Sequence, residues 1–201
     1  MRPGDVPDLD SELGRLWSSL VALHERLRNH TWSAYRRANP FTEDLFDWKE
    51  KGAFLGGHGV TVYDSAHVIG DVAIGDHSWI GPGCLLDGSG GLTIGSYCSI
   101  ASGAQLVSHD TVRWALSGGR LPYERSSVTI EDHCFVGTYA VVLRGVRVGT
   151  ESVIAAGSVV RDDVPPRTIV AGTPARPVGR VEFHGDDVQL VYFDHPSPPG
   201  G

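Results

Sequence analysis

The chain has 201 residues, a formal net charge of −7 and a hydrophobic content of 41%. This length suits one packed domain with a modest extension, and the apolar content is sufficient for its core. A free-standing acidic domain is a poor binder of nucleic acid, because phosphate binding requires a basic surface. No apolar run approaches the roughly 18 residues of a membrane span, and no apolar signal core follows the first residues. We therefore expect a cytoplasmic protein without a membrane span or a nucleic-acid partner.

Residues 1–55 predict a helical extension. Ser11 or Asp10 is suited to cap a first helix, and Asn39-Pro40 should end the helical region. A short second helix is expected from Thr42. The apolar residues of the first helix recur at helical spacing at Leu13, Leu16, Trp17, Leu20, Leu23 and Leu27. We expect this segment to pack against the rest of the protein or a neighbouring subunit, with a share in a binding site as the alternative.

From Val62 to about Pro165 the apolar period becomes six residues, which indicates an internal repeat. The fifth position of each unit holds a small or β-branched residue, and glycine recurs at the second position. The aliphatic first positions are Val62, Val68, Ile74, Ile80, Leu86, Ile94, Ile100, Leu106, Ile130, Val136, Val142, Val148, Ile154 and Val160. A random sequence would not keep both constraints over so many units.

Such a repeat predicts a left-handed parallel β-helix over residues 56–180, so the expected fold class is all-β with an α-helical extension. Three short strands, each followed by a tight turn, make one coil of about 18 residues that stacks on its neighbours by parallel strand pairing. The aliphatic residue points into the resulting prism. The fifth side chain faces inward near a corner, where only a small group fits.

All three cysteines, Cys84, Cys98 and Cys134, stand at the fifth position of a unit. Three thiols cannot all pair, and none of them belongs to the C-x-x-C spacing of a zinc site. We therefore expect small buried groups rather than disulfides, metal ligands or a nucleophile.

A long interruption of the repeat predicts a loop at about residues 110–127. The first positions Leu106 and Ile130 are 130 − 106 = 24 residues apart, and removing one six-residue step leaves 24 − 6 = 18 residues outside the prism. Long ordered loops on rigid scaffolds often contain functional residues. A smaller insertion, Asp87–Gly91, falls one coil earlier on an adjacent corner and could lie near the loop.

His109 stands out among nine histidines because it directly precedes this loop. An imidazole is the natural general base for an alcohol or an amine at neutral pH. The other histidines lie in the helical leader, at outward positions of the repeat or near the C-terminus, where structural explanations suffice. Such a base needs an orienting partner, and Asp110, Glu124 and Asp87 are nearly equal candidates.

The repeat ends after Val164-Pro165-Pro166. The segment up to Arg180 predicts a closing strand and turn. Residues 181–201 predict a C-terminal strand and then a disordered tail, which begins at about His195.

Four stretches, Ile130–Thr138, Val153–Val160, Val164–Pro166 and Ala171–Arg176, together with the histidine before the loop, resemble the hexapeptide-repeat acyltransferases of the left-handed β-helix fold. The resemblance covers about residues 56–180 and is nearest to the branch that O-acetylates sugars and surface-polysaccharide precursors. It implies acetyl-CoA as the acyl donor, no metal, and a homotrimer with its sites between adjacent prisms.

The resemblance also assigns roles to residues. His109 falls at the catalytic base, which lets the acceptor attack the thioester directly without an acyl-enzyme. The backbone N–H of Thr138 falls where the family stabilises the oxyanion. Ala156 matches a pantetheine contact, and Arg161 and Arg176 are candidates for the coenzyme A phosphates. Related enzymes often have Lys-Asp where this chain has Asp162-Asp163, so individual phosphate contacts are open.

The loop is the expected acceptor site. Trp114 and Tyr123 offer aromatic faces for a sugar ring, and Asp87 and Glu124 offer carboxylates. The loop arginines are suited to a nucleotide-linked or lipid-phosphate-linked sugar. The alternative is that Trp114 and Leu116 anchor the loop on a neighbouring subunit.

Three rival interpretations stay open. The γ-type carbonic anhydrases use the same helix with zinc held by three histidines between subunits, and His67, His77 and His133 point outward here. Unit counting puts His77 and His133 on one face but two coils apart, at about 5 Å per coil, too far for one intrachain site. A non-catalytic β-helix scaffold and N-acylation of an amino sugar or nucleotide sugar are the other two.

Overall fold

The computed structural model describes residues 10–45 and 48–193, which divide into two compact units between residues 47 and 48. This division falls earlier than the expected end of the extension at residue 55. The expectations for residues 1–9 and for a disordered tail from His195 lie outside the described residues. Within the described ranges, no helix is long and apolar enough to cross a membrane.

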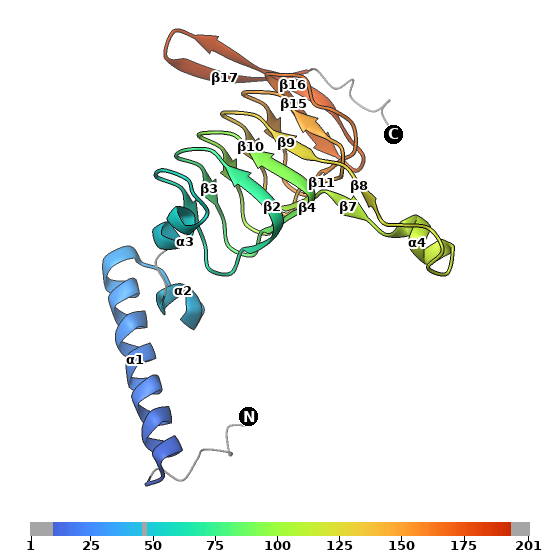
Figure 1. Ribbon diagram of the computed structural model, residues 1–201. Coiled ribbons are helices and arrows are strands. Elements are labelled where there is room, and N and C mark those ends of the chain that lie inside the picture. Colours follow the sequence, from blue (N-terminus) through green and yellow to red (C-terminus); the bar gives the residue numbers. More distant parts are fainter. Residues whose placement is uncertain (1–9, 46–47, 194–201) are drawn as a thin grey trace, which may run out of the picture. The chain divides into compact units, whose positions relative to one another are not determined.

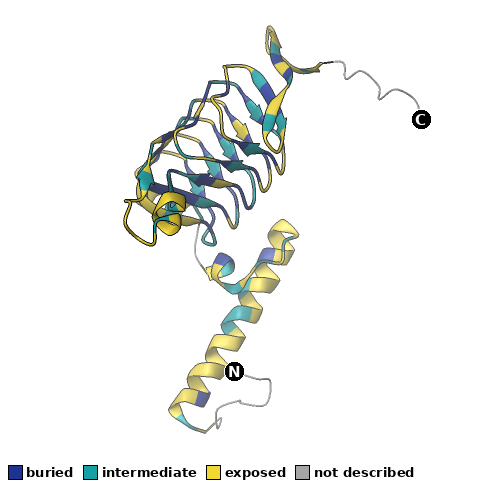
Figure 2. Cartoon of the chain, turned by 90° about the vertical axis from the view of Figure 1, so that its right-hand side faces the viewer, coloured by how far each residue is buried: buried dark blue, intermediate teal, exposed yellow. Residues whose placement is uncertain are grey.

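The first unit contains the two expected helices, α1 (Glu12–Tyr35) and α2 (Phe41–Leu45). The hydroxyl of Ser11 accepts a hydrogen bond from the backbone N–H of Gly14 at 3.0 Å, so Ser11 caps α1. α1 ends at Tyr35, ahead of Asn39-Pro40. The next residue, Arg36, takes a left-handed backbone conformation with φ of 54°. Exposed residues dominate the surface of α1 (Figure 2).

The second unit begins with α3 (Trp48–Phe54), which closes the N-terminal end of the repeat. Gly52 lies so close to Val60 that a Cβ would overlap the Val60 carbonyl group. The ammonium group of Lys51 donates to the carbonyl oxygens of Tyr63, Asp64 and Ala66 at 3.2, 2.7 and 2.7 Å. α3 is therefore packed directly on the first coil.

The repeat forms a left-handed β-helix of about six turns, as its period predicts (Figure 1). Equivalent strands of successive coils pair in parallel on three faces. The first face contains β1 (Thr61–Val62), β3 (Trp79–Ile80), β5 (Ser99–Ile100), β10 (Phe135–Val136), β13 (Val153–Ile154) and β15 (Thr168–Gly172). The second contains β6 (Gln105–Val107), β11 (Val141–Val142) and β14 (Val159–Val160), and the third contains β9 (Val128–Ile130) and β12 (Arg147–Val148). Two longer strands, β2 (His67–Ile74) and β4 (Leu85–Ile94), cross both the second and third faces.

The interior of the prism follows the two sequence constraints. The first-position residues are buried except Val68, which is half-buried, and the fifth-position residues are buried except Val72 and Gly90. The three cysteines are buried and free, as expected of small core groups. Burial raises the pKa of the Cys84 thiol, which makes it a poor nucleophile.

The chain leaves the prism where the interruption of the repeat predicted a loop. β7 (His109–Asp110) and β8 (Glu124–Arg125) form an antiparallel pair at the root of this loop, and α4 (Val112–Leu116) lies beyond them. Figure 1 shows the loop projecting from the coils. Its root stands between the second and third faces, at what we call the loop corner.

The C-terminal end of the β-helix closes with a hairpin. β16 (Ala175–His184) turns back antiparallel to β15, and β17 (Asp187–Tyr192) pairs antiparallel with β16. The expected closing strand is thus present, but it continues past Arg180 into the hairpin rather than ending in a turn there.

Candidate functional site

The root of the loop is fixed between neighbouring coils by Ser108, which is fully buried. Its backbone N–H donates to the Asp87 carbonyl at 3.2 Å, its hydroxyl accepts from Gly90 N–H at 2.7 Å, and its carbonyl accepts from Ser126 N–H at 2.9 Å. The Asp87–Gly91 insertion therefore lies on the loop corner itself, one coil earlier, and not on an adjacent corner. A side chain at Gly90 would meet both Ser108 and Ser126.

His109 contacts a buried carboxylate. Its Nδ1 lies against Oδ2 of Asp87, whose side chain is only 3% exposed, while the His109 side chain is 35% exposed. The other Asp87 oxygen accepts from Ser89 N–H at 2.9 Å and from the Ser89 hydroxyl at 2.5 Å. Burial alone would raise the pKa of Asp87, but the hydrogen bonds from Ser89 and His109 outweigh it and lower the pKa.

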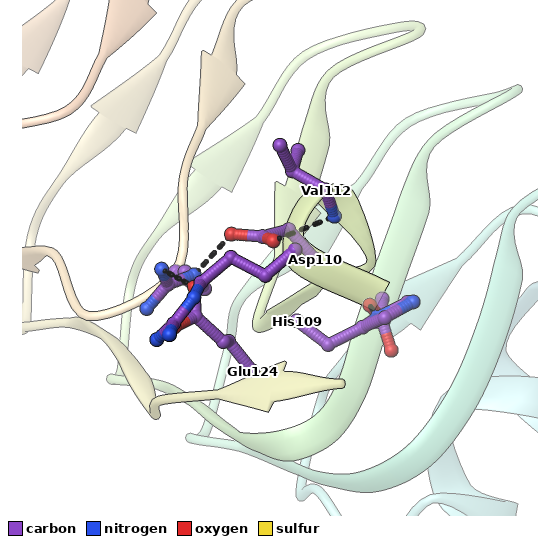
Figure 3. Close-up of polar contacts among 7 residues, drawn as sticks. His109, Asp110, Val112 and Glu124 are labelled. Carbon is purple, nitrogen blue, oxygen red and sulfur yellow. Dashed lines mark hydrogen bonds and ion pairs between the residues drawn. The ribbon is translucent and has the colours of Figure 1, made fainter. Parts of the chain in front are cut away.

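The ionised Asp87 carboxylate can accept a hydrogen bond from the Nδ1–H group of a neutral imidazole. The free lone pair of the ring then lies on Nε2. Within the described part of the chain, Nε2 of His109 has no hydrogen-bond partner. The geometry thus distinguishes the three candidate carboxylates, because Asp87 alone contacts His109. Figure 3 shows the His109 side chain pointing away from those of Asp110 and Glu124.

Asp110 and Glu124 are instead held by Arg144, which the sequence reasoning did not consider. Nε of Arg144 contacts Oδ2 of Asp110, and its Nη2 lies 2.6 Å from Oε2 of Glu124. The hydrogen bond from Arg144 is the main cause that lowers the pKa of Asp110. The repeat itself could have indicated Arg144. Ser126 ends the loop, and the residue one coil of about 18 residues later, which stacks on it, is Arg144.

The far part of the loop forms an aromatic hollow. The hollow has a volume of about 450 Å³ and is lined by Trp114, Gly119, Arg120, Leu121, Pro122 and Tyr123. The rings of Trp114 and Tyr123 meet edge to face at 5.4 Å, and the Arg125 guanidinium lies 5.9 Å from the Tyr123 ring centre. Glu124 does not line this hollow, since its two oxygens face Arg144 and Arg113.

Thr138 and Ala156 lie on a different corner, between the first and second faces. The Thr138 carbonyl accepts from Gly157 N–H at 2.9 Å, so the two residues occupy adjacent coils. Both are exposed. In the described chain the backbone N–H of Thr138 makes no hydrogen bond, which leaves a donor directed to the exterior. Within one chain, a whole face separates Thr138 from His109.

Arg161 and Arg176 share one carboxylate. Nε of Arg161 and Nη1 of Arg176 lie 3.4 and 3.3 Å from Oδ2 of Asp162, and all three side chains are more than half exposed. Asp162 thus neutralises part of the charge that the sequence assigned to phosphate binding. Exposed ion pairs of this kind contribute little to stability.

A different arrangement of histidines occupies the corner between the third and first faces, which we call the aromatic corner. His77 and Tyr97 stack at 4.9 Å between ring centres, Tyr97 and His133 stack at 5.4 Å, and His58 meets His77 edge to face at 5.4 Å. Tyr97 therefore separates His77 from His133, as unit counting predicted. In the described ranges no group of three His, Cys, Asp or Glu side chains is arranged to hold a metal ion.

Comparisons with known proteins agree with this architecture. Residues 127–161 match the family described as hexapeptide repeat of succinyl-transferase. The chain is 51% identical over 61 residues to a 2,3,4,5-tetrahydropyridine-2,6-dicarboxylate N-acetyltransferase from Staphylococcus aureus, which covers 30% of this chain. The matched stretch spans only 26% of the length of that curated relative.

Two solved structures extend the likeness to most of the fold. A hexapeptide-repeat containing acetyltransferase from Vibrio cholerae has a TM-score of 0.61 and 28% identity, over 81% of this chain and 91% of that one. An N-acyltransferase from Bacillus cereus, in complex with dTDP and 3-hydroxybutyryl-CoA, has a TM-score of 0.56 and 23% identity, over 62% of this chain and 70% of that one.

Proposed function

We propose that the chain, which resembles the hexapeptide-repeat acyltransferases in sequence and in fold, transfers an acyl group from acetyl-CoA to a nitrogen or oxygen nucleophile of a sugar-like acceptor. The observation that carries this proposal is the contact of His109 Nδ1 with the buried Asp87 carboxylate at the loop root. A partly exposed imidazole with one nitrogen fixed by a buried carboxylate and the other free is suited to general-base catalysis.

In the proposed reaction, Nε2 of His109 removes a proton from the acceptor amine or hydroxyl as that atom bonds to the thioester carbonyl carbon. Asp87 stabilises the imidazolium that forms. The tetrahedral intermediate then collapses by breaking the C–S bond, and His109 returns the proton to the departing coenzyme A thiolate. The chain's own thiols take no part, because Cys84, Cys98 and Cys134 are buried in the prism.

The proposed site requires a second copy of the chain. The backbone N–H of Thr138 is the donor we propose for the oxyanion, yet it lies on a different corner from His109. A homotrimer with adjacent prisms would let the His109 corner of one copy meet the Thr138 corner of the next. Ala156 and the Arg161 and Arg176 cations would then contact the pantetheine arm and phosphates of acetyl-CoA.

The acceptor is proposed from the loop and from the relatives. The names of the Staphylococcus aureus and Bacillus cereus proteins favour an amine, whereas the sequence resemblance favoured a sugar hydroxyl. Arg120 and Arg125 have no carboxylate partner in the described loop, and they stand beside the Trp114 and Tyr123 rings. Stacking rings beside free cations support a nucleotide-linked or other phosphate-linked sugar.

Asp87 and Glu124 were expected to contact the acceptor, but both carboxylates are already occupied. Asp87 faces His109 and Ser89, and Glu124 faces Arg113 and Arg144. We therefore propose that these two carboxylates act by holding other residues of the site in place, and that the aromatic hollow contacts the acceptor.

The test is release of free thiol from acetyl-CoA with matched acceptors, namely glucose against glucosamine and a nucleotide sugar against its 4-amino analogue. We expect turnover with one member of a pair, which also decides between hydroxyl and amine. Binding of coenzyme A is measured in parallel by calorimetry. Absence of both coenzyme A binding and thiol release across the panel would overturn the proposal and favour the non-catalytic scaffold.

A further inference from the structure

Two carboxylates stand directly opposite each other at the root of the loop. Asp110 in β7 pairs with Glu124 in β8, and His109 pairs with Arg125 in the same antiparallel ladder. Like charges directly across two strands repel and destabilise the pair. This ladder contains only two residue pairs, so it has few other hydrogen bonds to resist that repulsion.

Arg144 supplies the compensating charge from the next coil. Arg144 follows β11, on the coil after the one from which the loop departs. Its guanidinium group bridges Asp110 and Glu124 with two different nitrogens. Among the described residues, it is the one cation with ion pairs to both strands of the root. Gly145 N–H donates to the Ser126 carbonyl at 3.2 Å, which fixes the backbone beside Arg144 to the loop foot.

The two residues of β7 are held in opposite directions. His109 is held by Asp87 from the preceding coil, and Asp110 is held by Arg144 from the following coil. The short backbone segment of β7 is therefore held by a side-chain contact at each of its two residues. Without Arg144, Asp110 would lose its ion pair and Glu124 would keep only its pair with Arg113. We then expect the facing carboxylates to push the two strands apart and to loosen the backbone of His109.

We propose that Arg144 is a positioning residue, which joins the two strands of the loop root and so holds His109 against Asp87. The inference rests on the proposed function for its catalytic consequence. Its structural consequence, an ordered loop root, is independent of any reaction. The two parts can therefore fail separately.

The first measurement is hydrogen exchange of residues 109–127 in the full chain, without any substrate. In Arg144→Met we expect faster exchange of the loop-root amides than in the wild type. The matched control is Arg147→Met, since Arg147 lies on the same coil and pairs with a single carboxylate, Glu131. The control should leave loop exchange unchanged. Equal exchange in Arg144→Met and the wild type would overturn the proposal, whatever the activity.

The second measurement is turnover. Displacing a catalytic group by about 1 Å can cost about 100-fold in rate, so Arg144→Met should lower kcat by about 10- to 100-fold. The KM for acetyl-CoA should stay within about twofold, because Arg144 acts on the base and not on the donor. A rise in KM with an unchanged kcat would show a direct substrate contact and would overturn the positioning role.

A rescue variant separates charge neutralisation from other effects. Arg144→Met combined with Asp110→Asn and Glu124→Gln removes the repulsion together with the cation. We expect this triple variant to recover slow loop exchange and most of the lost kcat. Recovery of loop exchange without recovery of kcat would contradict the proposal. If the wild type itself shows no acyl transfer, the proposed function fails, and loop exchange still tests the Arg144 bridge.

Discussion

Histidines occur at two corners of this β-helix, and their surroundings differ. At the aromatic corner, His77, Tyr97 and His133 each take a left-handed backbone conformation, with φ of 59°, 55° and 59°, and their rings stack on one another. At the loop corner, His109 stands where the repeat is interrupted, and its ring faces a buried carboxylate. The same side chain thus completes a regular stack at one corner and meets an ionised group at the other.

In a repetitive fold, a reactive arrangement of side chains can form where the repeat is interrupted. At a regular corner each residue lies against its equivalents in the neighbouring coils, so the side chains pack on one another. Insertions break this equivalence. Both insertions of this chain, Asp87–Gly91 and the long loop, fall on the loop corner, and together they bring Asp87 to His109.

The largest expected effect is the contrast between His109→Ala and His133→Ala. Loss of a general base typically lowers kcat by about 100- to 10,000-fold, so we expect that loss for His109→Ala in the thiol-release assay. His133→Ala removes a ring of the aromatic corner and should leave kcat within about twofold. Similar losses of kcat in both variants would contradict a catalytic role that is specific to His109. Thermal unfolding of each variant serves as the control for folding.

The next effect is that of Asp87→Asn, which keeps the shape but removes the charge. We expect kcat to fall by about 100-fold or more, because the wrong tautomer of His109 is favoured. Asp87→Glu is the matched control that keeps the charge. Unchanged kcat in Asp87→Asn would show that the His109 contact is structural only, like those of the aromatic corner.

Asp87 also predicts a pH dependence of stability. Its pKa is lowered in the folded protein, so its contribution is present above the unfolded pKa of about 4 and is lost as pH falls through the folded value. At pH 7 we expect Asp87→Asn to cost about 1–3 kcal/mol of unfolding free energy. Urea unfolding of both proteins should show this difference shrinking below about pH 4. A constant difference down to pH 2 would contradict the assignment.

The smallest effect concerns the aromatic corner itself. Tyr97→Ala removes two ring contacts, each worth about 0.5–1.5 kcal/mol, so we expect a stability loss of about 1–2 kcal/mol with unchanged kcat. Tyr97→Gly removes the same ring but relieves the positive φ, and should cost less. A change in kcat for either variant would link the two corners and weaken the contrast between them.

The repeat predicted most of the fold because two constraints act on every unit. Aliphatic residues such as Ile100 and Ile130 fill the prism, and small groups such as Cys84 fill its corners, so burial follows directly from position. The loop and His109 were predictable for the same reason, since an interruption of the period marks where the chain leaves the prism.

The contacts around His109 were less predictable. Asp110 is adjacent to His109 in sequence and Asp87 is 22 positions away, yet Asp87 makes the contact, because side-chain directions at the loop root decide it and sequence distance does not. Those directions depend on Ser89 and Arg144, which belong to the coils before and after the loop. Hydrogen bonds between coils join residues that are distant in sequence, such as Gly90 and Ser108, which are 18 positions apart. They follow from the stacking of coils and not from local sequence pattern.

The two ends of the β-helix also determine how long it can become. A stack of parallel coils could in principle continue indefinitely, because each end presents a strand edge to the next chain. Here the Lys51 ammonium occupies three carbonyl oxygens of the first coil, and Gly52 brings a helix against it. The lysine and the helix thus limit the stack at its N-terminal end, and the antiparallel pairing of β15, β16 and β17 limits it at the other, so the number of coils is set by these two end structures.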